Sequence, residues 1–155
     1  QKNNKWIYEN IASKVHTRGP LKSYRRACFN DIGGLQASIG WDSVDELIAV
    51  YYGWTFKTLA ALKVKHLKPT GAHYSPSARY LQGEALYKMR SGFSIAALSA
   101  IKMALNKKKF IYFFNCMMGY FRAYKTKAKY IVTENQGKFI RRYRWRALQK
   151  KIIRI

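Results

Sequence analysis

Three carboxylates stand within five consecutive positions of the stretch from Gly40 to Trp54, GWDSVDELIAVYYGW. They are Asp42, Asp45 and Glu46, in a chain of 155 residues that has only 7 acidic residues against 30 basic ones. A carboxylate held beside a reacting hydroxyl can act as a general base. This cluster is therefore the first place in the sequence to look for catalysis.

The same cluster also has a purely structural interpretation. Asp42 precedes an apolar run with helical spacing, where an N-cap belongs, and Asp45 stands three residues later, as in a capping box. Each acid in a first helical turn is favoured by the helix dipole by about 0.3–1 kcal/mol. From the residues alone, capping and catalysis explain the cluster equally well.

Other residues have types that suit phosphate or metal binding. Arg25 and Arg26 follow Tyr24, and a planar guanidinium can hold a phosphate through two parallel hydrogen bonds. The alternative is a solvated basic surface. His66 ends the run LKVKH and is either a ligand or a hydrogen-bonded structural residue.

The C-terminal tail, residues 138–155 (KFIRRYRWRALQKKIIRI), combines aromatic and basic side chains. Phe139, Tyr143 and Trp145 stand among seven Lys and Arg residues between positions 138 and 151. Such a segment suits single-stranded nucleic acid, whose bases stack on aromatic rings, or an anionic lipid surface. The tail by itself does not decide between these partners.

Positive charge is concentrated in the second half of the chain. Residues 1–77 carry 11 basic and 5 acidic side chains, a net charge of +6, whereas residues 78–155 carry 19 and 2, a net charge of +17. A potential of that sign favours nucleic acid, an anionic membrane surface or a phosphorylated ligand.

The two cysteines, Cys28 and Cys116, lie far apart and lack the C-x-x-C spacing of a zinc or redox site. We predict two reduced, buried thiols in a cytosolic protein.

The elements that must position these residues are mainly helices. Apolar spacing predicts helices over 6–15, 25–32 and 43–52, with Gly33-Gly34 ending the second and Gly53 ending the third. Alternating side chains over 54–59 and 61–67 predict two short strands.

After residue 77 the pattern is helical, with predicted helices over 77–90, 94–106, 108–127 and 136–151. Leu98, Ile101 and Leu105 form one apolar stripe. The run 110–121 is apolar around nearly its whole circumference, but its 12 residues fall short of the roughly 20 that cross a bilayer. We predict an α+β fold that is mostly α, with no transmembrane helix.

Three stretches, taken in order, resemble the C-terminal half of bacterial family 2 glycosyltransferases of the GT-A fold. They are HTRGPLKSYRRACFNDIGGL (16–35), GWDSVDELIAVYYGW (40–54) and LKVKHLKPTG (62–71). The resemblance implies that 1–76 is the acceptor-side part of the catalytic domain and that 77–155 is a basic helical C-terminal region. The nucleotide-binding half, with its Asp-x-Asp metal motif, is expected before residue 1.

The resemblance also implies roles for the acidic cluster. The family has Glu-Asp at this helix start, and counting back from the closing Gly-Trp places Trp41 at the Glu and Asp42 at the Asp. Asp42 is therefore the expected general base, with Asp45 and Glu46 sharing or supporting that catalytic role.

The remaining roles follow from the same resemblance. Arg25, Arg26 and Trp41 are expected to bind the donor, and His66 is expected near the metal and the diphosphate. The metal would be Mg²⁺ or Mn²⁺, bound mainly by the upstream half, so that this portion alone is expected to be inactive.

The implied reaction transfers a sugar from a nucleotide-diphosphate donor to an acceptor hydroxyl of a surface polysaccharide or lipid-linked glycan. The basic helical region is expected to dock on the anionic inner face of the cytoplasmic membrane. The alternative is a basic module without catalysis that binds nucleic acid or a membrane.

Overall fold

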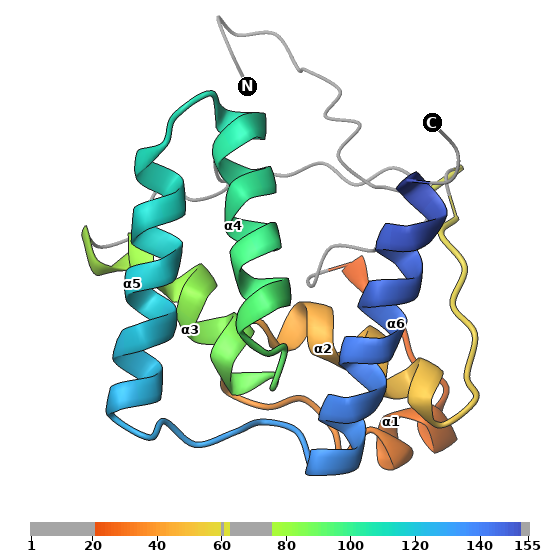
Figure 1. Ribbon diagram of the computed structural model, residues 1–155. Coiled ribbons are helices and arrows are strands. Elements are labelled where there is room, and N and C mark those ends of the chain that lie inside the picture. Colours follow the sequence, from red (N-terminus) through yellow and green to blue (C-terminus); the bar gives the residue numbers. More distant parts are fainter. Residues whose placement is uncertain (1–20, 60, 63–75, 153–155) are drawn as a thin grey trace, which may run out of the picture.

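The computed structural model describes residues 21–59, 61, 62 and 76–152. This part of the chain forms α1 (Arg26–Asp31), α2 (Trp41–Tyr51), the 3₁₀ turn η2 (Pro76–Tyr80), α3 (Leu81–Lys88), α4 (Phe93–Lys107), α5 (Ile111–Lys125) and α6 (Glu134–Ile152). Figure 1 shows α4 and α5 as an antiparallel pair beside α3, whereas α1, α2 and α6 lie together on the other side.

The described residues contain helices and no strand, so the predicted α+β class with short GT-A-type strands is wrong for this part of the chain. The predicted strand at 54–59 is irregular chain. Most of the predicted strand at 61–67, and all of the predicted helix at 6–15, lie outside the described residues. Alternating side chains indicate an extended segment, but a strand also needs a neighbouring backbone, which the sequence period does not specify.

The predicted helices within the described residues are confirmed. The end of α1 follows from the two glycines after it, because the N–H of Gly33 donates to the carbonyl of Asn30 at 3.0 Å and that of Gly34 to the carbonyl of Phe29 at 2.9 Å. Gly33, the residue after the C-cap, has the positive φ, 77°, that this helix-ending motif requires. In the described part of the chain, no helix combines the length and the apolar character needed to cross a bilayer.

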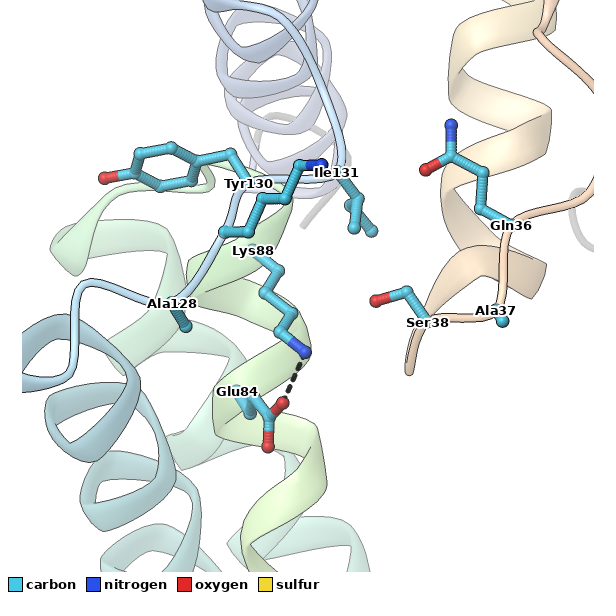
Figure 2. A pocket seen from close by; sticks show the side chains of 9 residues that line it. Gln36, Ala37, Ser38, Glu84, Lys88, Ala128, Tyr130 and Ile131 are labelled. Carbon is cyan, nitrogen blue, oxygen red and sulfur yellow. Dashed lines mark ion pairs between the residues drawn. The ribbon is translucent and has the colours of Figure 1, made fainter.

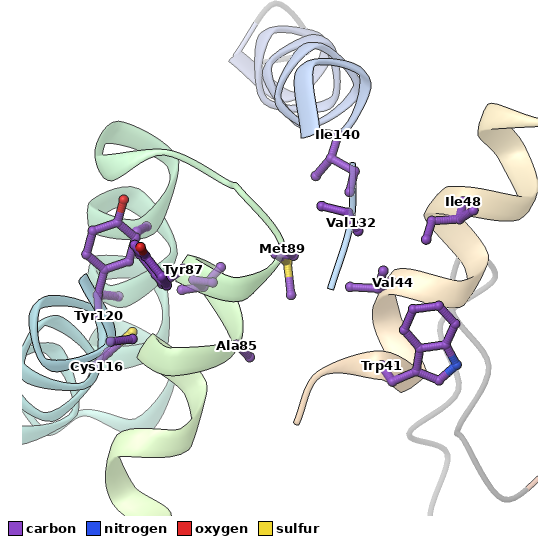
Figure 3. Close-up of a cluster of buried hydrophobic side chains, with 14 of the residues drawn as sticks. Trp41, Val44, Ile48, Ala85, Tyr87, Met89, Cys116, Tyr120, Val132 and Ile140 are labelled. Atoms are coloured by element: carbon purple, nitrogen blue, oxygen red, sulfur yellow. The ribbon is translucent and has the colours of Figure 1, made fainter. Parts of the chain in front are cut away.

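One buried cluster includes side chains from both predicted regions, 1–76 and 77–155. In Figure 3, Val44 and Ile48 of α2 face Met89, which follows α3, and they also face Val132, which precedes α6, and Ile140 of α6. Val44 and Ile140 are fully buried. Burying a side chain of this size stabilises a fold by about 1.5–3 kcal/mol. The position of α2 is therefore fixed by α3 and α6.

Both cysteines are buried free thiols, as predicted, whereas the cytosolic location stays a prediction. Burial raises the pKa of the Cys116 thiol to about 11. The pKa of Cys28 is also raised, first by burial and then by the nearby carboxylates of Asp31 and Asp45. Since the thiolate is the reactive form, neither side chain is suited to act as a nucleophile at neutral pH.

Helices α3 and α5 touch through their backbones at two glycines. A Cβ atom on Gly83 would lie 1.8 Å from the carbonyl oxygen of Cys116, and one on Gly119 would lie 2.0 Å from that of Tyr80. Neither position has room for any side chain. Glycine at both positions therefore sets the distance between these helices.

Replacing either glycine by alanine will destabilise the protein. On an exposed helical surface Gly→Ala is favourable by about 1 kcal/mol, but at Gly83 or Gly119 the added carbon forces the helices apart, and we expect a loss of about 1–3 kcal/mol. Urea unfolding followed by circular dichroism measures the change. Gln82→Ala, at an exposed position on α3, is the control and should change stability little. Stabilisation by Gly83→Ala and Gly119→Ala would contradict the close helix crossing.

Candidate active site

Helix α2 begins before the acidic cluster. Its N-cap is Gly40, with φ 82°, and no side chain caps the helix. The Gly40 carbonyl accepts the N–H groups of Ser43 at 3.0 Å and Val44 at 3.1 Å. Asp42 is therefore inside the first turn rather than at the N-cap, and the predicted capping box with Asp45 is wrong. Gly40 tolerates a positive φ because glycine has no side chain. The helix therefore begins at Trp41, two residues before the predicted start at residue 43.

Asp45 is 1% exposed and is surrounded by hydrogen-bond donors. The ammonium of Lys22 lies 2.8 Å from its Oδ1 atom, and the Tyr24 hydroxyl donates to its Oδ2 atom. The backbone N–H of Glu46 also donates to Oδ1, at 2.6 Å. A buried carboxylate is tolerated only with partners of this kind. Both oxygens of Asp45 are thus engaged within the protein.

The Lys22 ammonium joins several groups of α2 at once. Besides Asp45, it lies 3.0 Å from Oε1 of Glu46, and it donates to the main-chain carbonyl of Asp42. Its side chain is only 6% exposed. An ammonium has three donors, and each finds an acceptor here. Lys22 therefore ties the segment before α1 to the first turns of α2.

Tyr24 completes this network as a hydrogen-bond donor. Its burial, and then its bond to Asp45, raise the pKa of the phenol well above its ordinary value. The hydroxyl therefore keeps its proton over the whole physiological pH range.

The third acid, Asp42, is in a different environment. Its side chain is exposed, and no hydrogen bond or ion pair joins its carboxylate to another described residue. Its main chain, in contrast, is fixed by the bond from Lys22. The cluster is thus divided: two of its three carboxylates hold the structure, and the third is presented to solvent from a fixed backbone.

Arg25 and Arg26 lie at the start of α1 with exposed side chains. They follow Tyr24 directly, and Tyr24 is bonded to Asp45 of α2. The fold therefore brings both arginines to the same corner of the molecule as the acidic cluster. Their binding to donor phosphate stays a prediction.

The other two predicted ligand-binding residues are placed differently. Trp41 is 5% exposed and packs in the core. Its burial leaves almost no indole surface for a donor, which the predicted donor-binding role requires. His66 lies outside the described residues.

The described part of the acidic corner does not fit a divalent metal. No group of three His, Cys, Asp or Glu side chains is arranged to hold an ion among the described residues. Asp45 and Glu46 already share the ammonium of Lys22, and a metal would have to displace that cation from the same oxygens.

A pocket of about 360 Å³ lies beside the segment that leads into α2. Figure 2 shows Gln36 and Ser38 on one wall, with the Glu84–Lys88 ion pair of α3 and the loop 128–131 opposite. The sequence did not predict this pocket, because the three segments that line it lie far apart in the sequence. The one signal was Glu84, one of only two acids after residue 77 and four residues before Lys88.

Comparison with known protein families, curated proteins and solved structures finds no match for this chain. The resemblance to family 2 glycosyltransferases therefore stays a prediction. Any proposal for the function depends on the residues and on the geometry of the acidic corner.

Replacing Asp45 by asparagine will strongly destabilise the fold. The change removes the closest counter-charge of the buried Lys22 ammonium and leaves Glu46 at 3.0 Å. Removing one partner of an isolated buried ion pair costs about 3–5 kcal/mol, which is the upper bound here. Thermal and urea unfolding measure the loss. Glu84→Gln is the matched control, because it breaks the partly exposed pair with Lys88, which is worth about 0.3–0.5 kcal/mol. Equal effects of the two substitutions would show that the Lys22 network is not a buried ion pair.

Proposed function

We propose that this chain forms the acceptor-side part of a glycosyltransferase, in which Asp42 is the general base. The observation that carries the proposal is the division of the acidic cluster. Asp45 and Glu46 are committed to Lys22, whereas the Asp42 carboxylate is exposed on a fixed main chain. A base needs an open path to its substrate and a defined position, and Asp42 has both.

The proposed chemistry is transfer of a sugar from a nucleotide-diphosphate donor to an acceptor hydroxyl. As the hydroxyl oxygen attacks the anomeric carbon, its proton passes to the Asp42 carboxylate. The new carbon–oxygen bond forms while the bond from the sugar to the diphosphate breaks, and the diphosphate leaves with the electron pair. Lys22 acts as a positioning residue, because it holds the main-chain carbonyl of Asp42.

The donor is assigned partly to Arg25 and Arg26. Both arginines are exposed and directly follow Tyr24, which bonds to Asp45 of α2, and arginine suits the phosphate oxygens of a diphosphate. The nucleotide, the sugar and a divalent Mg²⁺ or Mn²⁺ ion belong, by the resemblance, to a nucleotide-binding half with which this part works. The ion would stabilise the charge of the departing diphosphate.

A part of the acceptor away from its reacting hydroxyl is assigned to the pocket beside the segment that leads into α2, because Asp42 is not one of the residues that line this pocket. Its volume of about 360 Å³ falls within the range of small-ligand sites, roughly 300–1,000 Å³. The Gln36 amide, the Ser38 hydroxyl and the Glu84–Lys88 pair offer donors and acceptors for sugar hydroxyls. The acceptor class is a surface polysaccharide or a lipid-linked glycan, and we place the activity at the inner face of the cytoplasmic membrane.

Asp42→Asn will abolish most of the transfer without loss of stability. Removing a general base lowers kcat by about 10²–10⁴-fold, while the exposed side chain contributes little to the fold. The assay uses the full-length gene product that carries this chain. Radiolabelled sugars from UDP, GDP and dTDP donors are transferred to acceptors in native membranes, and urea unfolding is measured in parallel.

Asp31→Asn is the matched control, because Asp31 is another exposed carboxylate and an amide oxygen still accepts from the indole N–H of Trp54. It should leave kcat unchanged. The proposal is wrong if the wild-type protein transfers no sugar from any donor, or if Asp42→Asn retains the wild-type kcat.

A further inference from the structure

Helices α4 and α5 present large apolar side chains away from the core. On α4 the buried side is made by small residues such as Ala96, Ala100 and Ala104. The stripe predicted from Leu98, Ile101 and Leu105 lies on the outer side, and Leu105 is 66% exposed. We call the outer side of this pair the hairpin face; it consists of Leu98, Ile101, Leu105, Phe110, Phe114 and Met118.

The exposed apolar side chains of α4 and α5 form one surface. Ile101 and Leu105 of α4 line a wholly apolar pocket of about 310 Å³ together with Phe110 and Phe114. Beyond the other end of the face, the ring of Phe93 at the start of α4 lies 5.9 Å from that of Phe121 on α5. Single exposed apolar residues are common on protein surfaces, but a continuous face of this kind marks an interaction site.

The charge around the hairpin face is of one sign. Residues 85–133 contain ten Lys and Arg residues and no Asp or Glu. Exposed Lys107 ends α4, and exposed Lys108 and Lys109 belong to the turn between α4 and α5, which lies at the top of the helix pair in Figure 1. Lys102 and Arg122 are exposed on the two helices themselves. Apolar side chains bordered by cations are complementary to an anionic bilayer surface.

Other partners fit this face less well. A second copy of the chain would bring the same positive charges together. Nucleic acid would pair with the lysines but would leave the aliphatic Leu98, Ile101 and Leu105 in water, because bases stack on aromatic rings. In the predicted tail, Phe139 of α6 packs on Tyr51 of α2, whereas Trp145 is exposed as a single large aromatic ring rather than as part of a continuous apolar face.

We infer that the hairpin face docks on an anionic lipid surface. The apolar side chains of the face enter the boundary between headgroups and acyl chains, and Lys107, Lys108 and Lys109 bind headgroup phosphates. This inference rests on the membrane location in the proposed function but does not depend on Asp42 or on sugar transfer.

Vesicle flotation of the 155-residue chain tests the inference. Neutral phosphatidylcholine vesicles are compared with vesicles that also contain phosphatidylglycerol, at low and high salt. The wild-type chain should bind the anionic vesicles and lose binding as salt rises. The double variant Leu105→Ser, Phe114→Ser should bind at least about tenfold more weakly, because both side chains leave water only on docking. Leu35→Ser, at an apolar position that is 65% exposed outside the hairpin face, is the control and should bind like wild type.

A second pair of variants tests whether vesicle binding depends on where the basic residues lie or only on the net charge of the chain. Replacing Lys107, Lys108 and Lys109 by Gln should weaken anionic-vesicle binding roughly a hundredfold. Replacing the exposed Arg142, Arg146 and Lys150 of α6 by Gln removes the same charge and should weaken vesicle binding much less.

Four outcomes overturn the inference: no vesicle binding, equal binding to neutral and anionic vesicles, unchanged binding by the double variant Leu105→Ser, Phe114→Ser, or a larger loss of binding from the α6 variant than from the lysine variant. Asp42→Asn should bind vesicles normally, so that failure here and failure of sugar transfer remain distinguishable.

Discussion

The arrangement of the acidic corner depends on one buried ammonium. Lys22 shares its charge between Asp45 and Glu46 and donates to the main chain of Asp42. Burying a charge is tolerated only when partners compensate its lost hydration, and here each of the three ammonium donors has an acceptor. Because Lys22 precedes α1 and its acceptors belong to α2, this contact joins two separate segments. Helix α2, in turn, packs on α6 and on Met89 at the end of α3 through Val44 and Ile48.

This contact also assigns different tasks to three adjacent acids. From the sequence, a helix cap and a catalytic cluster explain the three acids equally well. In the structure the three acids have different environments, so that neither explanation applies to all of them. No side chain caps α2. Among the three acids, Asp45 and Glu46 pair with Lys22, and Asp42 alone has an exposed carboxylate. The buried ion pair beside the exposed acid fixes the main chain that bears Asp42, through packing and hydrogen bonds.

The sequence predicted the helices because their apolar residues recur with the helical period, and Gly33-Gly34 marked the end of α1. The strand prediction at 54–59 was wrong, because alternating side chains indicate an extended segment but do not show whether another strand lies beside it. The sequence identified the acids but not Lys22 as their partner, because 20 or more residues separate them and no period connects them. The stripe that includes Leu105 was visible in the sequence. Its outward direction was not, because helical periodicity reveals a face but not what that face contacts.

The central claim is that Asp42 is accessible while Asp45 is held inside the Lys22 network. Carboxyl footprinting with a carbodiimide and glycine ethyl ester, followed by mass spectrometry of the native chain, tests it most directly. We predict rapid labelling of Asp42, at a rate similar to that of exposed Asp31, and protection of Asp45, which becomes labelled only after unfolding. Labelling of Asp45 as fast as Asp42 in the folded protein would contradict the division of the acidic cluster on which the account depends.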